Sequence, residues 1–267
     1  MSFLELERLE SEIASSVAAP LIADSPNRQG NRAHTATLLE DAFITLVAAL
    51  APDLSVEVGA HEASYSKRVK ANSPGLTAIA FEANPHVHKA YWPELDQLGI
   101  DYRNCAICSE SGPMPFFIPR KWAGGEFKPG NMISSLLMRR NESFEYDTVT
   151  VDGLTLDAAL ADTDYRRATA WIDAEGVQRE ILEGAPGFLS RAQAIFIELE
   201  SREVWLGQGD AGSIGQMLEQ AGFRMVMRDN IARSQYNAVF LKNNIVVTES
   251  IMTEVSDYAA KIKSILT

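Results

Sequence analysis

Between Leu54 and Lys242 the chain repeatedly alternates a short apolar run with a segment of helical periodicity. Nearly continuous apolar runs are typical of strands buried on both faces, and the helices between them allow neighbouring strands to run parallel. The predicted strands are 54–60, 76–84, 100–109, 168–175, 193–200, 223–229 and 236–242, and the predicted helices are about 61–72, 85–98, 177–190 and 213–221. The last two strands lie too close together for a crossover helix, so we expect the final strand to be antiparallel. The pattern predicts an α/β three-layer sandwich with a mostly parallel, seven-stranded, Rossmann-like sheet.

Three segments stand outside this alternation. Residues 1–52 are predicted as an N-terminal helical extension, with a polar loop at 25–31 and a second helix at about 34–50. Residues 244–267 are predicted as a C-terminal helix after the 53–243 domain. The helical stripes that support these two predictions are Phe3, Leu6, Leu9, Ile13 and Val17 in the first segment, and Ile251, Val255, Tyr258, Ile262 and Ile265 in the last. Residues 110–150 carry little helical period, so we expect an inserted hairpin or loop near the site. Its aromatic residues suit either an acceptor pocket or a small separate core; they are Phe116, Phe117, Trp122 and Phe127.

Charge and apolar content restrict the partners that we expect. The net charge of -12, from 24 basic and 36 acidic side chains, disfavours nucleic acid, because phosphate binding needs a basic surface. The longest apolar run, Phe43 to Ala51, is too short to span a bilayer, and the acidic start of the chain is unlike a secretory signal. We therefore expect a cytoplasmic protein that binds neither nucleic acid nor membrane.

Cys105 and Cys108 form a C-x-x-C pair, a spacing that can indicate redox or metal chemistry. They fall within a predicted strand, where residues three apart point to opposite faces. Neither a second C-x-x-C nor a paired histidine motif accompanies them. We expect two buried structural thiols.

The first predicted strand ends in a loop with one glycine, within "LSVEVGAHEASYS" (54–66). Gly59 permits a tight turn into a helix with free N–H groups. A dinucleotide loop needs G-x-G-x-x-G for its pyrophosphate, whereas this loop offers only Gly59 with Ala60 and Ala63. The second strand ends in Glu82, 23 residues after Gly59 and followed by Ala83 and Asn84; a carboxylate at this spacing accepts hydrogen bonds from ribose hydroxyls. The two strand ends predict a nucleoside cofactor without phosphates, and S-adenosylmethionine is such a cofactor.

Carboxylates also follow two later predicted strands. If the chain is still extended, Asp173 and Glu175 point to the same face, and the next strand ends in Glu198 and Glu200. Acidic residues near a helix N-terminus are one explanation. The alternative is a group of carboxylates facing the site as general base or metal ligands, and we favour it because capping does not require so many.

Seven segments together resemble the FkbM-type methyltransferase family over about Leu54 to Glu200. They are "VEVGAHEASYS", "AFEANPHVHKAY", "NCAICSESG", "SSL" (134–136), "VDGLTLDAAL", "WIDAEGVQREILEGA" and "IFIELE". The most specific is I-D-x-E-G followed by the helix that ends in L-x-G-A. The resemblance implies a class I, S-adenosylmethionine-dependent methyltransferase that often methylates a hydroxyl of a sugar, glycan or polyketide.

The same resemblance implies roles for individual residues. Glu57, Gly59, His61 and Tyr65 would contact the cofactor around the first loop, and Glu82 would hold the ribose. Cys105 and Ala106 would lie beside the adenine, and Asp173 and Glu175 would lie where the methyl group meets the acceptor.

Four positions depart from the family pattern. Glu57 stands where the family usually has Asp, His61 where it has Asn, Ala63 where it has Gly, and Trp171 where it has Lys. The Ala63 methyl is expected to crowd the methionine end of the cofactor, and Trp171 removes a charge beside Asp173. These departures are the basis of the alternative that the chain is a non-catalytic nucleoside-binding module of the same fold. A nucleotide-dependent oxidoreductase is disfavoured because its phosphate loop is absent.

The predicted reaction is O-methylation of a small-molecule or glycan acceptor. Asp173 is the preferred general base, with Glu175 and His61 as alternatives. A divalent cation held by Asp173, Glu198 and Glu200 is the second route, and we prefer the metal-free one. The flanking helices suit either a cover over the site or a homodimer interface.

Overall fold

The computed structural model describes residue 11, residues 28–229 and residues 234–266. The apolar stripe predicted at Phe3 to Val17 lies outside the described residues. The second helix, α2 (Arg28–Leu50), begins six residues earlier than the sequence pattern predicts, within the predicted polar loop.

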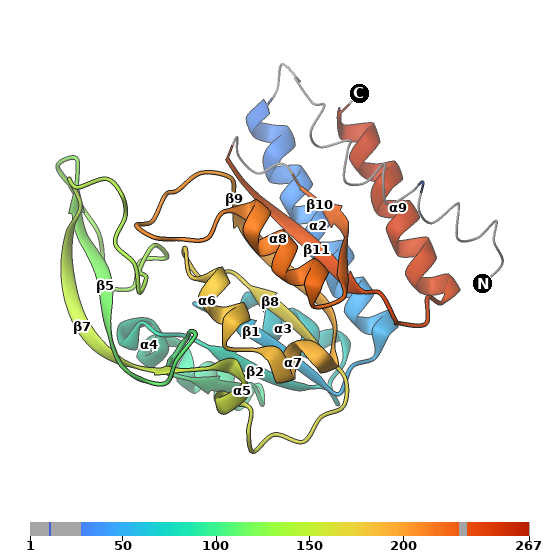
Figure 1. The fold of residues 1–267 in the computed structure, drawn as a ribbon, viewed down its shortest axis with the longest axis horizontal. Helices are drawn as coiled ribbons and strands as arrows, with labels where there is room; N and C mark the ends of the chain where they lie inside the picture. The colour runs from blue at the N-terminus through green and yellow to red at the C-terminus, as the bar shows by residue number, and fades with distance from the viewer. Residues whose placement is uncertain (1–10, 12–27, 230–233, 267) are drawn as a thin grey trace.

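A seven-stranded sheet in the order β10-β11-β9-β8-β1-β2-β3 forms the centre of the molecule (Figure 1). The strands β1, β2, β3, β8 and β9 pair in parallel, and β11 runs antiparallel to both of its neighbours. Their bounds are β1 Leu54–Val58, β2 Thr77–Phe81, β3 Asp101–Arg103, β8 Ala168–Ile172, β9 Ala192–Glu200, β10 Phe223–Arg228 and β11 Gln235–Lys242. The predicted α/β class, the mostly parallel sheet and the antiparallel last strand are confirmed.

Helices cover both faces of this sheet, and all five residues of β1 are buried between them. Leu54, Val56 and Val58 face the core under α5 (Leu156–Ala159), α6 (Gln178–Glu183), α7 (Pro186–Arg191) and α8 (Ala211–Gln220). The opposite face is covered by α2, α3 (Ser64–Asn72), α4 (Pro85–Gln97) and α9 (Glu249–Leu266). The result is a three-layer sandwich.

The helices α2 and α9 lie side by side over β9, β10 and β11 (Figure 1). The predicted stripe of α9 is buried at Ile251, Val255, Tyr258 and Ile262. A window of α2, Ala33–Leu50, has a mean hydropathy of 1.3 and is long enough to cross a membrane, but half of it is buried inside the protein. A core helix passes the same test, and burial against the sheet favours that interpretation here.

Two predicted elements are divided in the structure. The predicted helix 177–190 is α6 followed by α7, because Pro186 cannot continue the hydrogen-bond ladder. Gly184, at the break, approaches the chain so closely that an added Cβ would lie 2.2 Å from the carbonyl oxygen of Cys108. The predicted strand 100–109 is β3 followed by β4 (Ala106–Ile107), and β4 belongs to a second sheet.

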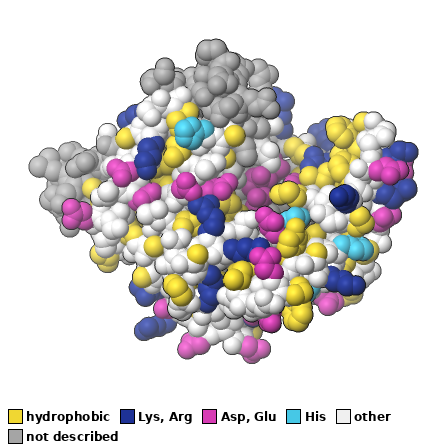
Figure 2. Space-filling view, turned by 180° about the vertical axis from the view of Figure 1, so that it is seen from behind, with side chains coloured by type: hydrophobic (Ala, Val, Ile, Leu, Met, Phe, Trp, Pro, Cys, Tyr) yellow, Lys and Arg dark blue, Asp and Glu magenta, His cyan; other side chains and the backbone are white. Residues whose placement is uncertain are grey.

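The predicted insertion forms this second, four-stranded sheet in the order β4-β7-β5-β6. Two long antiparallel strands dominate it, β5 (Gly112–Trp122) and β7 (Glu145–Leu154), with β6 at Gly125–Glu126. We call residues 112–154 the arm, because Figure 1 shows β5 and β7 projecting beyond the central sheet. Figure 2, seen from behind, shows hydrophobic side chains among Lys and Arg on the arm, at the right of the view.

Candidate active site

A pocket opens at the carboxyl ends of β1, β2 and β8, the edge at which parallel α/β sheets bind ligands. Its walls combine apolar side chains from the sheet with polar groups from the loops above. Most of the predicted cofactor contacts line it, namely Gly59, His61, Glu82, Ala83, Cys105, Ala106 and Asp173, and so does Glu175. The sheet and the arm contribute the apolar residues Val58, Phe81, Ile107, Phe116, Leu136 and Val177.

The loop after β1 is shaped by left-handed backbone. Gly59, His61 and Ala63 have φ angles of 77°, 46° and 54°. An added Cβ on Gly59 would lie 2.0 Å from the carbonyl oxygen of Asp173, so the loops after β1 and β8 pass each other only because this position is glycine. Strained backbone of this kind clusters at functional sites.

Glu82 is held at the end of β2 by two backbone groups. Its carboxylate accepts hydrogen bonds from the N–H of Asn84 at 2.7 Å and of His61 at 2.8 Å. The side chain is 8% exposed, and burial raises its pKa. Each carboxylate oxygen keeps a second acceptor direction, so Glu82 can accept hydrogen bonds from ligand hydroxyls without losing either backbone contact.

Four predicted cofactor contacts do not line the pocket. Glu57 accepts hydrogen bonds from the N–H groups of Tyr65 (3.4 Å) and Ser66 (2.8 Å) and so caps α3. The Tyr65 hydroxyl shares a hydrogen bond with Ser55 on the α2 side of the sheet. Ala60 packs in the core under α4, and the Asn84 side chain caps α4 by accepting from His86 N–H. These four side chains therefore pack behind the loops and do not form the pocket wall.

Two departures from the family pattern also lie away from the pocket. Ala63 is fully buried with Ala60 and Leu95, so the expectation that its methyl group crowds the cofactor is wrong. The ring of Trp171 stacks on Phe196 at 3.5 Å and on Tyr65 at 5.0 Å, on the face covered by α2. Alternation along β8 directs it there, because Ala170 and Ile172 face the opposite core.

Burial of Glu57 predicts a pH-dependent stability. Burial raises the pKa of this carboxyl to about 7 from the ordinary value of 4.5. Because the folded state prefers the protonated form, its stability falls by up to about 3 kcal/mol as the pH rises from 4.5 to 7. Glu57→Gln should therefore gain stability relative to the wild type over this range, with the difference constant above it. Urea unfolding at several pH values measures the difference.

The exposed neighbour Glu62 provides the control for that measurement. Glu62→Gln removes an exposed carboxylate from the same loop and is measured over the same pH series. A Glu57→Gln difference that does not change with pH would show that Glu57 titrates normally in the folded protein.

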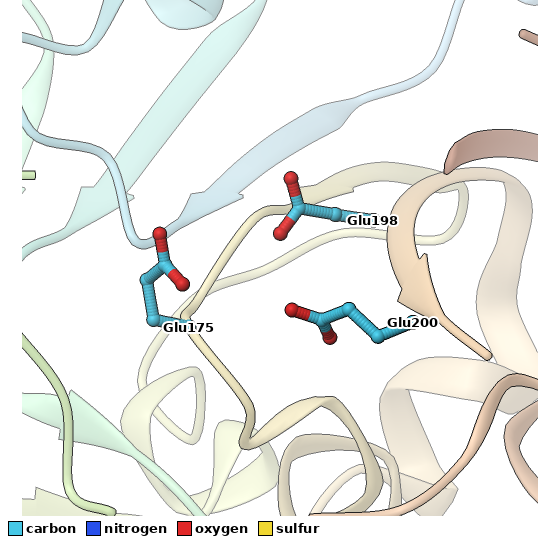
Figure 3. Close-up of side chains that lie close together, drawn as sticks. All are labelled: Glu175, Glu198 and Glu200. Carbon is cyan, nitrogen blue, oxygen red and sulfur yellow. The ribbon is translucent and has the colours of Figure 1, made fainter. Parts of the chain in front are cut away.

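Four carboxylates gather where the chain leaves β8 and β9: Asp173, Glu175, Glu198 and Glu200. One ligand oxygen from each of Glu175, Glu198 and Glu200 lies within 4.8 Å of the others (Figure 3). Burial, and then the charge of Glu200, raises the pKa of Asp173 to about 6. Burial, and then the charge of Asp173, raises the pKa of Glu175 to about 8. Of the alternative metal-ligand set Asp173, Glu198 and Glu200, the structure brings the two glutamates together with Glu175, whereas Asp173 is not one of the three residues whose oxygens converge.

Arg139, which the sequence analysis did not identify, supplies a positive charge to this group. Its guanidinium lies 3.8 Å from the Glu175 carboxylate and stacks over the rings of Trp205 at 4.4 Å and Phe144 at 5.6 Å. The backbone of Arg139 also pairs with Trp205. Arg139 thereby links the arm to the loop after β9, a contact without a sequence signal because Glu175 and Trp205 are distant from it along the chain.

The arm completes the pocket with residues 131–136. Ser135 donates a hydrogen bond to the carbonyl of Glu175 at 2.5 Å, and Asn131, Met132 and Ser134 lie along the pocket wall. The "SSL" segment at 134–136 was a signal for this part of the site in the sequence.

The predicted aromatic residues of the insertion divide between the two roles considered for them. Phe116 lines the pocket and also belongs to a small core with Ile118. On the outer part of the arm, Trp122 and Phe127 stack on Phe144, and Phe117 packs edge-on against Tyr146.

Both cysteines are free and buried, as predicted. Cys105 lies at the pocket wall, and burial raises the pKa of its thiol to about 11. Because the thiolate is the reactive form, this thiol is suited to an apolar wall and not to nucleophilic chemistry. Cys108 donates to the carbonyl of Glu110 at 3.1 Å.

Comparison with known proteins gives a family match and a set of structural neighbours. The family model described as the methyltransferase FkbM domain matches residues 57–225, well over half of the chain. No curated protein matches this chain in sequence.

Three methyltransferases are among the solved structures similar to this chain. A precorrin-6y C5,15-methyltransferase from Geobacter metallireducens GS-15 has 13% identity and a TM-score of 0.42 over 75% of this chain and 87% of that chain. A TehB-like SAM-dependent methyltransferase from Corynebacterium glutamicum has 12% identity and a TM-score of 0.37 over 82% and 100%. An O-methyltransferase family protein from Burkholderia thailandensis has 9% identity and a TM-score of 0.39 over 90% and 68%. Superpositions at these scores are too loose to identify a common substrate.

Proposed function

The chain belongs to the FkbM-type family of S-adenosylmethionine-dependent methyltransferases, and we propose that it methylates a hydroxyl group of a sugar, glycan or polyketide-like small molecule. The observation that carries the proposal is the placement of Glu82 and Gly59 at neighbouring strand ends, on one pocket that Asp173 and Glu175 also line.

The residues of the pocket fit S-adenosylmethionine. Glu82 offers a fixed carboxylate for two ribose hydroxyls, and Ala106 and Ile107 with Phe81 offer an apolar wall for adenine. The loop after β1 presents one glycine and no phosphate cradle, which suits a nucleoside cofactor without phosphates better than a dinucleotide. When bound, S-adenosylmethionine supplies an electrophilic methyl group.

The protein's task at such a site is to align the acceptor, exclude water and receive a proton. We assign alignment to the arm, because residues 131–136 and Phe116 close the pocket wall opposite the sheet. We assign the proton to Asp173, which lies between the loop after β1 and the other carboxylates. Glu175 and His61 remain the alternatives; His61 Nε2 shares a hydrogen bond with the carbonyl of Gly130 at 3.3 Å and so already has a partner.

Glu82→Ala tests the donor half of the proposal. We expect S-adenosylmethionine and S-adenosylhomocysteine to bind the wild type in calorimetry, and the substitution to weaken both by at least about 10-fold, because it removes charge-assisted hydrogen bonds to the ribose. The matched control is Glu94→Ala, which removes an exposed glutamate of α4 that pairs with Lys67. Unchanged binding to Glu82→Ala, with the fold intact by circular dichroism, would contradict the assignment.

A screen of hydroxylated acceptors tests the acceptor half of the proposal. Mass spectrometry should find a product in which a methyl group has replaced one hydroxyl hydrogen. Sugars, glycans and polyketides are the first acceptors to test. Methylation of an amine and of no hydroxyl would overturn O-methylation. Cofactor binding without transfer to any acceptor would favour the alternative, a binding module of the same fold.

Partners, location and oligomeric state are proposed from features of the sequence. The net charge of -12 favours a protein that does not bind nucleic acid, and we propose a cytoplasmic enzyme that acts away from membranes. A homodimer through the helices that flank the domain is the oligomeric proposal, and size-exclusion chromatography with light scattering tests it.

A further inference from the structure

Glu175, Glu198 and Glu200 converge from two parts of the chain. Glu198 and Glu200 are two residues apart on β9, so both point to the face of the sheet covered by α2. Glu175 follows β8 and reaches the same place from the neighbouring turn. Figure 3 shows the three carboxylates turned toward a common centre, and their ligand oxygens lie within 4.8 Å of one another.

One oxygen of this trio lacks a partner. Glu198 is 7% exposed, and its Oε1 is buried without a hydrogen bond in the described part of the chain. The neighbouring glutamates are better satisfied, since Glu200 accepts a hydrogen bond from Gln208 at 3.1 Å and Glu175 pairs with Arg139. A buried carboxylate oxygen without a donor is costly unless something positive occupies the space in front of it.

We propose that Glu175, Glu198 and Glu200 bind a divalent cation of the oxygen-preferring class, Mg²⁺, Mn²⁺ or Ca²⁺. Carboxylate oxygens are the ligands that these cations select. Opposite oxygens around Ca²⁺ lie about 4.6 to 5.2 Å apart, and around Mg²⁺ about 4.2 Å. Carboxylate oxygens up to 4.8 Å apart can therefore bind Ca²⁺ as they stand. To bind Mg²⁺, the three side chains must move together by a few tenths of an ångström.

The charge balance supports a cation at this place. Three carboxylates face one another with Arg139 as the one cation that pairs with them among the residues at 28–229 and 234–266. Arg139 pairs with Glu175 and its charge also acts on Glu200, whereas Glu198 has no ion pair among these described residues.

The position gives the cation a role at the acceptor. Glu175 belongs to both the trio and the pocket wall, so an ion on the trio would lie at the edge of the pocket, beyond Asp173. A bound hydroxyl that coordinates such an ion becomes more acidic and is held in one orientation. This role rests on the proposed function, whereas binding of the ion rests on the trio alone.

The experiment measures Mn²⁺ binding to the full chain by electron paramagnetic resonance, with Mg²⁺ and Ca²⁺ as competitors. We expect one equivalent of Mn²⁺ to bind and both competitors to displace it, the tighter one identifying the preferred ion. Glu198→Gln should weaken binding by more than about 10-fold, because even the partners of metal ligands change affinity by about 10- to 100-fold. The control is Glu203→Gln, an exposed glutamate that pairs with Arg140.

Each outcome decides the proposal. Equal binding to the wild type and Glu198→Gln, or no Mn²⁺ binding to the wild type, overturns it; in the second case a proton shared among the carboxylates is the occupant. S-adenosylhomocysteine binding to every variant is measured in parallel. A variant that binds the nucleoside but not Mn²⁺ is folded, so loss of the ion is separated from failure of the methyltransferase proposal.

Discussion

Gly59→Ala should abolish cofactor binding, with a loss of about 100-fold or more in affinity for S-adenosylhomocysteine. The new Cβ would lie 2.0 Å from the carbonyl oxygen of Asp173, and backbone cannot move away as a flexible side chain can. Alanine at a φ of 77° adds about 1 to 2 kcal/mol of strain. The loops after β1 and β8 must then separate, and both of them line the pocket.

Substitutions at two other glycines separate the effect of the steric clash from that of the backbone strain. Gly124→Ala, in the turn of the arm, has a similar φ of 83° but no atom within 4 Å, so it carries the strain without the clash. Gly75→Ala carries neither. Both should bind S-adenosylhomocysteine like the wild type in calorimetry. Normal binding by Gly59→Ala would mean that the close approach to Asp173 does not shape the cofactor site.

Asp173→Asn should lower turnover by about 100- to 10,000-fold while leaving cofactor affinity nearly unchanged. Asparagine keeps the shape of the side chain but cannot accept the proton from the acceptor hydroxyl. Its backbone stays in place, because the N–H of residue 173 donates to the carbonyl of Val58 at 3.0 Å. The measurement is product formation from the acceptor found in the screen, beside calorimetry with S-adenosylhomocysteine.

The control for Asp173→Asn is Asp152→Asn, an exposed aspartate on β7. Mn²⁺ binding adds a second readout, since Asp173 is outside the trio and its loss should leave the ion bound. Turnover within about threefold of the wild type would remove Asp173 as the base. Glu175 would then be the next side chain to test.

The order of strands and helices in the central domain was predictable because each run of apolar residues was long enough to specify one element. The positions of Gly59 and Glu82 followed from the same pattern, since parallel strands present their carboxyl ends at one edge. Element boundaries were less accurate where backbone chemistry intervened. Pro186 divided one predicted helix, and the chain between Arg103 and Ala106 turned from the central sheet into the second sheet.

The direction of individual side chains was the main source of error. Glu57 and Tyr65 were predicted at the cofactor from their position near the loop, yet both point into the α2 side of the sheet, as the alternation along β1 and the first turn of α3 require. Ala63 and Trp171 were treated as changes to the pocket, although both are core residues.

The sequence alone specifies the α/β fold and the loop after β1, because periodicity and a single glycine act over a few neighbouring residues. It also determined which strand ends carry carboxylates. Which of these carboxylates meet depends on tertiary packing: Glu175 joins Glu198 and Glu200, and Arg139 reaches them from the arm. These contacts depend on a turn after β8 and on two loops that are far apart in sequence but lie together in the folded protein. No local pattern encodes such distances, because they are set by how the sheet and the arm pack together.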